Sequence, residues 1–109
     1  MPPPNLTVYG SKTLCEVIAS LVAPLKIPKF FPDELDPLVY VRLFHPCMGE
    51  DSDYYLLDFD PQTGHCEAYV NGDLGLVDIG ELGKVFVGGL KFEVAKYFKP
   101  CRLSKVRGD

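Results

Sequence analysis

The chain has 109 residues, which suffices for one domain and leaves no room for a second core. No apolar run approaches the roughly 20 residues that span a bilayer, and the first five residues lack the basic and apolar regions of a secretory signal, so we expect a cytoplasmic protein. The four cysteines show no Cys-x-x-Cys spacing, which predicts free thiols and argues against a disulfide framework.

The net charge of −4 hides a segregation of charge along the sequence. Residues 30–90 contain twelve acidic residues and only two basic ones, whereas residues 91–109 contain six basic residues and two acidic ones. An acidic region attracts basic partners, and a basic region attracts acidic partners or nucleic acid. The sequence therefore contains two candidate binding regions of opposite charge.

The first predicted element is a helix that begins at Ser11 and ends before Pro24. Ser11 is a favourable N-cap residue. Apolar residues follow at the spacing of one helical face: Leu14, Val17, Ile18, Leu21 and Val22. Pro24 ends the helix because it lacks an N–H and disfavours the α conformation at the preceding residue. The proline-rich stretch 24–37 is predicted to be an irregular connector.

Three strands are predicted over residues 38–70. The first runs from Leu38 to Phe44 and alternates, with Val39, Val41 and Leu43 on one face. The second covers residues 54–59, with Tyr55, Leu57 and Phe59 on a shared face, and the third covers residues 65–70. Residues 60–64, with the sequence Asp-Pro-Gln-Thr-Gly, are typical of a β-turn between the last two.

The remaining elements are predicted to be short. The Asn71-Gly72 turn leads to a fourth strand around residues 74–77, and Asp78 with Glu81 resembles a capping box that starts a helix through Lys84. A last strand is expected over residues 90–98 from its even spacing of apolar side chains.

The predicted fold class is α+β. We expect an antiparallel sheet of four to five strands, with a long N-terminal helix packed on one face and a short second helix. This single domain covers residues 1–100, and residues 101–109 form a mobile basic C-terminal tail.

Several of these motifs occur together in one known family. The segments Asp36-Pro-Leu-Val-Tyr-Val-Arg-Leu-Phe-His-Pro46 and Asp58-Phe-Asp-Pro61 with Gly64, followed by residues 73–85 and 90–100, resemble the domain-of-unknown-function family numbered 2958. The resemblance covers roughly residues 11–103. It implies a small stand-alone protein encoded on plasmids, integrated elements or phages, with no assigned activity and no catalytic residues. Members usually carry tryptophans at the start of the second strand, where this chain has Tyr54 and Tyr55.

No metal centre or catalytic constellation is predicted. Zinc prefers four nitrogen or sulfur ligands, and adjacent His65 and Cys66 would point to opposite faces of a strand. A set of His45 and Cys47 with Cys66 or Cys101 stays geometrically conceivable. The carboxylates of residues 51, 53, 58 and 60 lack the spacing of a calcium loop and have no nucleophile–base pair beside them. We therefore expect a non-enzymatic protein without a cofactor.

Two binding hypotheses follow. In the first, the acidic central region binds a host protein or protein complex, with contact residues Glu50, Asp51, Asp53, Tyr54 and Asp58. The mobile-element context implied by the resemblance suggests a nucleic-acid-handling defence complex, inhibited in the manner of an anti-CRISPR. In the alternative, the chain is a nucleic-acid-binding accessory protein of a mobile element, which contacts phosphates through Lys96, Lys99, Arg102, Lys105 and Arg107.

Overall fold

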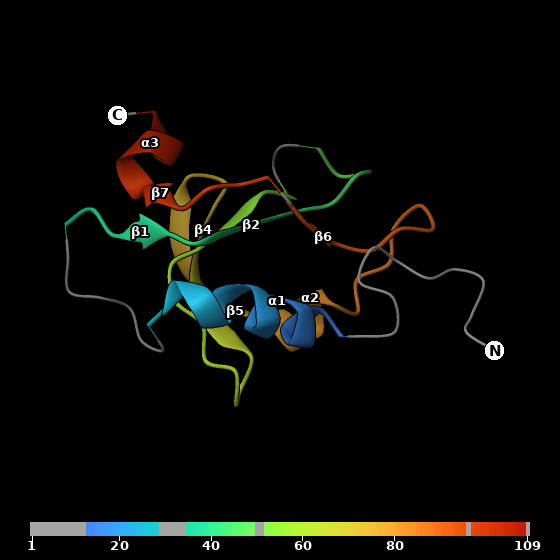
Figure 1. The fold of residues 1–109 in the computed structure, drawn as a ribbon. Coiled ribbons are helices and arrows are strands. Elements are labelled where there is room, and N and C mark those ends of the chain that lie inside the picture. The colour runs from blue at the N-terminus through green and yellow to red at the C-terminus, as the bar shows by residue number, and fades with distance from the viewer. Residues whose placement is uncertain (1–12, 29–34, 50–51, 96, 109) are drawn as a thin grey trace.

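A five-stranded antiparallel sheet and a two-stranded sheet form the framework of the protein (Figure 1). The computed structural model describes residues 13–28, 35–49, 52–95 and 97–108. The strands are β1 (Leu38–Val39), β2 (Val41–Phe44), β3 (Tyr54–Leu56), β4 (His65–Val70), β5 (Asp73–Asp78), β6 (Glu93–Val94) and β7 (Cys101–Arg102). The helices are α1 (Leu14–Val22), α2 (Ile79–Leu82) and α3 (Leu103–Arg107), with a 3-10 turn, η1 (Ala23–Leu25), after α1. The predicted α+β class with an antiparallel sheet is confirmed.

The larger sheet is a meander with one returning strand. Its order is β5-β4-β3-β2-β6, so β2 to β5 pair in chain order and β6 returns to the free side of β2. Both predicted turns are present. Gly64 adopts φ 80° at the end of the β3–β4 connection, and Asn71 and Gly72 adopt φ 49° and 88° between β4 and β5. Positive φ at both central residues gives a two-residue hairpin the twist that its strands require.

Helix α1 is not the long helix that the sequence predicts. Thr13 is its N-cap: the Thr13 hydroxyl accepts a hydrogen bond from the Glu16 N–H at 3.2 Å, and the Glu16 carboxylate accepts one from the Thr13 N–H. The predicted cap, Ser11, lies outside the described residues. The α-helix spans nine residues, and Pro24 falls within η1. Leu14, Ile18 and Val22 are buried, as the apolar stripe predicts, but Leu21 is 44% exposed.

The predicted strand 38–44 divides into β1 and β2. Val39 pairs with Cys101 of β7, whereas Val41 pairs with Leu56 of β3, so the chain passes from one sheet to the other at Tyr40. The predicted alternation of burial is confirmed, because residues 39, 41 and 43 are buried and the intervening side chains are half-buried. β1 and β2 therefore share one alternating pattern of buried side chains but pair with strands of different sheets.

Apolar side chains collect in two clusters. The main core joins α1 and α2 to the larger sheet, and its buried members include Leu14, Ile18, Leu43 and Phe92. A second core is formed by Val39, Leu57 and Leu103, with half-buried side chains of residues 55, 69, 98 and 106 packed against it. Figure 1 shows α1 and α2 below β2 and β6, and α3 with β7 above these strands.

The chain leaves regular strand geometry after Leu56, which separates side chains that the sequence places on one face. Leu57 enters the second core, whereas Phe59 is buried in the main core. The predicted shared face is therefore confirmed for Tyr55 and Leu57, which both contribute to the second core, and is wrong for Phe59. A turn follows at the predicted residues, but its backbone hydrogen bond closes five residues rather than the four of a β-turn: the Gly64 N–H donates to the Asp60 carbonyl at 2.7 Å. The Asp60 carboxylate accepts from the Gln62 N–H at 3.0 Å, as expected for an aspartate that opens a turn.

Residues 101–108, for which the sequence predicts a mobile tail, form β7 and α3 instead. Leu103 is only 1% exposed and belongs to the second core. The Asp36 carboxylate accepts hydrogen bonds from the Ser104 N–H at 2.8 Å and from the Ser104 hydroxyl at 2.7 Å, so it satisfies an orphan donor at the start of α3. These contacts hold the segment against the domain.

Candidate functional site

The predicted acidic contact residues lie in different environments. Asp53 accepts a hydrogen bond from Arg42 Nη2 at 3.0 Å and another from the Tyr55 hydroxyl at 3.3 Å, and its side chain is 14% exposed. The Tyr54 ring is half-buried and stands edge-to-face with Phe92, with 5.4 Å between the ring centroids. The charge of Asp53 is thus partly neutralised by Arg42, and part of the Tyr54 ring is covered by Phe92.

Asp58 does not suit the contact role that the sequence suggests, because its side chain is buried. Its carboxylate accepts a hydrogen bond from the Glu67 N–H at 2.7 Å, which fixes the irregular segment after β3 beside β4. Burial raises the pKa of this carboxyl group. Asp58 is therefore a structural acceptor. Glu50 and Asp51, the other predicted acidic contacts, lie outside the described residues.

A buried histidine, His45, precedes the acidic stretch of residues 47–53, which we call the acidic loop. Within residues 45–52, the His45 N–H donates to the Ser52 hydroxyl at 3.1 Å, and the Ser52 hydroxyl donates to the Gly49 carbonyl at 2.6 Å. His45 Nδ1 accepts from the Cys47 N–H at 3.1 Å, and His45 Nε2 lies 2.8 Å from the Leu90 carbonyl oxygen. Since Nδ1 is an acceptor, we assign the ring proton to Nε2. Both ring nitrogens are engaged.

A short apolar hairpin lies against this segment. Val87 and Leu90 exchange backbone hydrogen bonds of 2.9 and 3.0 Å around Gly88 and Gly89, which adopt φ 61° and 78°. A Cβ atom on Gly88 would lie 2.9 Å from Cys47 Sγ, so only glycine lets the hairpin approach so closely. The hairpin is thereby held beside the start of the acidic loop.

Exposed apolar side chains gather at this hairpin. Four of them are between 41% and 54% exposed, and we call them the hairpin patch: Met48, Phe86, Val87 and Leu90. Aromatic and methionine side chains are typical of the centres of protein interfaces. The hairpin patch is therefore the strongest candidate contact surface among the described residues. Sequence reasoning did not identify this patch: Leu90 falls in the predicted strand 90–98, and exposed apolar side chains have the same signature in a sequence as buried ones.

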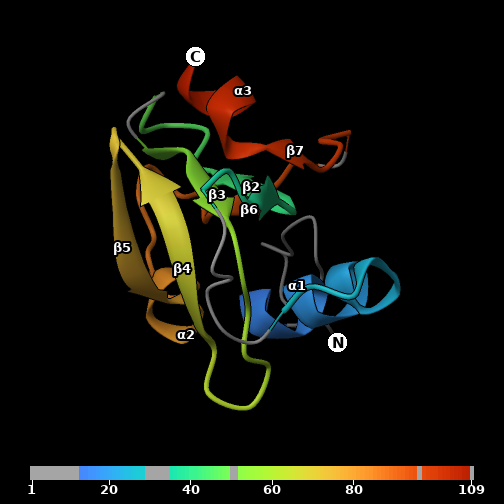
Figure 2. The same ribbon diagram turned by 90° about the vertical axis from the view of Figure 1, so that its left-hand side faces the viewer.

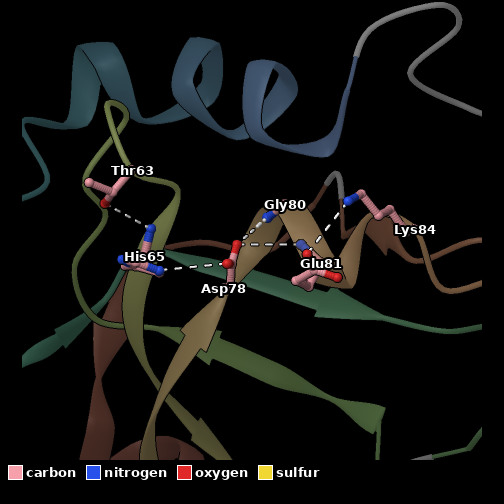
Figure 3. A network of polar contacts seen from close by, with 6 residues as sticks. All are labelled: Thr63, His65, Asp78, Gly80, Glu81 and Lys84. Carbon is pink, nitrogen blue, oxygen red and sulfur yellow. Dashed lines mark hydrogen bonds and ion pairs between the residues drawn. The ribbon is translucent and has the colours of Figure 1, made fainter.

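A polar network at the junction of β4, β5 and α2 contains a histidine and a carboxylate (Figure 3). Asp78 Oδ1 accepts from the Gly80 N–H at 2.9 Å and from the Glu81 N–H at 3.4 Å, which confirms Asp78 as the predicted N-cap. His65 Nε2 lies 3.6 Å from Asp78 Oδ2 on an exposed surface. The geometry accounts for Asp78 as a helix cap with an exposed histidine beside it.

Cys15, which lies close to this network, lacks the environment of a nucleophile. Cys15 Sγ lies 3.1 Å from the position of a Cβ atom on Gly64. Burial raises the pKa of the Cys15 thiol, and the negative charges of Asp78 and Glu16 raise it further. Reactive cysteines have a depressed pKa near positive charge, so Cys15 is better explained as a packed thiol. Burial likewise raises the pKa of Cys66, to about 12.

The histidines and cysteines of the conceivable zinc set are not brought together. Among the described residues, no group of three or more His, Cys, Asp or Glu side chains is arranged to hold a metal ion. His45 has hydrogen-bond partners at both ring nitrogens, and Cys66 is buried in the main core. Cys101 lies in β7, which pairs with β1. None of the described helices is long and apolar enough to cross a membrane.

The basic residues of the alternative hypothesis lie around α3. Lys99 and Lys105 are exposed, and Lys96 lies outside the described residues. Arg102 donates to the Asp36 carbonyl at 3.1 Å. The hydrogen bonds from Ser104, and then the charges of Arg107 and Arg102, lower the pKa of Asp36. This carboxylate offsets part of the positive charge.

Comparison of the chain with protein-family models, with curated proteins and with solved structures finds no match. The family resemblance therefore remains a prediction that rests on the quoted sequence motifs alone. Two of the surfaces described above bear on the two binding hypotheses. The hairpin patch bears on the hypothesis of protein binding, and the exposed lysines near α3 bear on the hypothesis of nucleic-acid binding.

Proposed function

We propose that this chain is a non-enzymatic, cytoplasmic protein-binding factor, and that it contacts its partner through the hairpin patch together with the acidic residues that follow Met48 in the sequence. The single observation that carries the proposal is the exposure of Phe86, Val87 and Leu90 at a hairpin that is held against His45 and Cys47, together with the exposure of Met48. Exposed apolar side chains that lie close together on a protein surface are typical of a protein interface.

The rigidity of the hairpin supports the proposal. The Leu90 carbonyl accepts hydrogen bonds from both the Val87 N–H and His45 Nε2, and Gly88 packs on Cys47. A surface that is already ordered loses little conformational entropy on binding. The acidic residues Glu50 and Asp51 follow Met48 closely in the sequence, so a partner surface with an apolar depression and basic residues would match this part of the chain.

The kind of partner is inferred from the resemblance. A small protein of a phage or another mobile element benefits from blocking host defence, so we propose a host protein or a nucleic-acid-handling defence complex as the target, inhibited in an anti-CRISPR-like manner. The acidic loop is compatible with such a target, because a complex that handles nucleic acid presents basic surfaces.

The test is an affinity capture of partners from host lysate with tagged protein, in the presence and absence of nuclease. Phe86→Ser should remove the partner, since Phe86 is the only aromatic and the most exposed side chain of the hairpin patch. Leu21→Ser is the matched control, because Leu21 is similarly exposed but lies on α1. We expect a nuclease-resistant partner that the wild type and Leu21→Ser retain and that Phe86→Ser loses.

Two outcomes would contradict the proposal. If Phe86→Ser and Leu21→Ser lose the partner equally, the hairpin patch is not the contact surface. If every partner disappears with nuclease, the alternative of nucleic-acid binding is favoured, and the double variant Lys99→Glu, Lys105→Glu should then abolish a salt-dependent affinity for DNA or RNA. Deletion of residues 101–109 cannot make this distinction, because it would remove Leu103 from the second core.

A further inference from the structure

Strand β5 forms a free edge of the larger sheet. It pairs along all six of its residues with β4, and no described strand pairs with its other side. Figure 2 shows β5 as the outermost strand of the sheet. A strand in this position presents unpaired backbone donors and acceptors along its length.

The hairpin geometry identifies which backbone groups face that edge. The Asn71-Gly72 turn makes Val70 and Asp73 the hydrogen-bonded pair that closes the hairpin, and such pairs alternate along an antiparallel ladder. The odd-numbered residues of β5 therefore bond toward β4. The Ile79 N–H keeps the same alternation, since it donates to the Gly64 carbonyl at 2.8 Å. The N–H and C=O groups of Leu74 and Leu76 consequently point away from the sheet.

The side chains of β5 leave this edge accessible. Leu76 is 69% exposed and Leu74 is 47% exposed. A Cβ atom on Gly75 would meet no atom within 4 Å. Natural edge strands are usually protected by lysine, proline or a bulge, and β5 contains no lysine or proline and pairs with β4 in unbroken register. The edge thus has the features of a strand that accepts a partner.

The charges around β5 define the partner. Asp73 and Asp78 stand at its two ends, Glu67 lies opposite Leu76, and β4 and β5 contain no lysine or arginine. A second copy of β5 would bring two more aspartates to this edge. An extended segment with lysine or arginine near its ends would instead place opposite charges beside Asp73 and Asp78.

We propose that β5 binds an extended, basic segment of a partner protein, which adds to the larger sheet as a sixth strand. Apolar side chains of that segment would pack beside Leu74 and Leu76, and its backbone would hydrogen-bond with theirs. The proposal deepens the protein-binding function, but it uses residues on the opposite edge of the sheet from β6 and the hairpin patch, so either surface can fail without the other.

The experiment selects a displayed library of random linear peptides on the wild-type protein. The most enriched peptide is synthesised, and its affinity is measured by fluorescence anisotropy. Leu76→Pro removes the outward N–H without removing a hydrogen bond to β4, and Leu76→Thr is the matched control that keeps it. We expect peptides that alternate apolar residues and carry lysine or arginine. Affinity should fall at least about tenfold in Leu76→Pro and change by less than about threefold in Leu76→Thr.

Amide hydrogen exchange on the unmodified protein gives a second readout that does not depend on how Leu76→Pro folds. The peptide should slow exchange of the Leu74 and Leu76 amides at least about tenfold and leave Gly75 and Val77, which already face β4, nearly unchanged. The proposal is overturned if no peptide is enriched, if the enriched peptides are acidic, or if the Leu74 and Leu76 amides gain no protection. A dimer in sedimentation velocity that Leu76→Pro dissociates would assign the edge to a second copy instead.

Discussion

The strongest test of the fold is the substitution Leu103→Ala, because it asks whether residues 101–108 belong to the domain. Leu103 is 1% exposed and packs with Val39 and Leu57 in the second core. Alanine removes three carbon atoms, which at about 0.8 kcal/mol each amounts to about 2.4 kcal/mol of lost transfer free energy. The cavity that remains adds to this cost, so we expect a loss of about 3 kcal/mol in the free energy of unfolding.

The assay is equilibrium unfolding in urea, with the dependence on urea concentration checked for two-state behaviour. Lys105→Ala is the control on the same helix; because Lys105 is exposed, it should change the free energy of unfolding by less than about 0.5 kcal/mol. A natural domain has about 5–15 kcal/mol of stability, so the loss in Leu103→Ala should be plain. A loss below about 1 kcal/mol with an unchanged urea slope would show that α3 is not docked, and the reasoning on the second core would then be wrong.

Three further predictions concern other parts of the fold. The lowered pKa of Asp36 means that its carboxylate stabilises the folded state above the ordinary aspartate pKa of about 4, and that this contribution disappears as the pH falls through the lowered pKa. The difference in the free energy of unfolding between wild type and Asp36→Asn, measured in urea from pH 7 downward, should therefore shrink at acid pH. A difference that does not change with pH would contradict the capping role of Asp36. Gly64→Ala should lower the free energy of unfolding by more than the roughly 1–2 kcal/mol of an alanine in the left-handed conformation, because its Cβ would lie 3.1 Å from Cys15 Sγ. Gly72→Ala would place no atom within 4 Å of its Cβ, so it should lose only the energy of the backbone strain. Equal losses of melting temperature in the two variants would show that the contact with Cys15 is unimportant. Iodoacetamide at pH 8 should modify the exposed Cys47 first. The buried Cys66, with its pKa of about 12, should be modified only when the protein unfolds, which peptide mass spectrometry can follow. Early labelling of Cys66 would contradict its place in the main core.

Local patterns allowed the sequence to predict the elements whose contacts are close along the chain. The hairpin of β4 and β5 follows from Asn71-Gly72, and the turn after β3 follows from Asp60 and Gly64, because each depends on the conformation of a few neighbouring residues. The N-terminus of α1 was misplaced by two residues because Ser11 and Thr13 are both favourable caps, and only Thr13 has Glu16 three positions on.

Long-range contacts could not be predicted in the same way. Nothing near residue 104 indicates that Asp36 caps α3, and nothing in the alternation of residues 38–44 indicates that Val39 and Val41 pair in different sheets. The predicted acidic surface failed at Asp58 for a similar reason. A carboxylate that accepts a backbone N–H inside the fold has the same sequence signature as one that faces solvent, so composition alone overestimates how many acidic groups a partner can reach.

The pairing of β1 with β7 also bears on how the chain folds as it leaves the ribosome. Leu38 pairs with Arg102, whereas β2 to β5 connect nearest neighbours and can form on a microsecond timescale. At about 5–20 residues per second, synthesis takes roughly 1 to 5 seconds to advance from Asp78 to Leu103. During that interval Val39 and Leu57 have a sheet to pack on but no α3 to cover them. The nascent chain therefore exposes an apolar surface that α3 covers in the finished domain. A chaperone would have its best opportunity to bind during this interval.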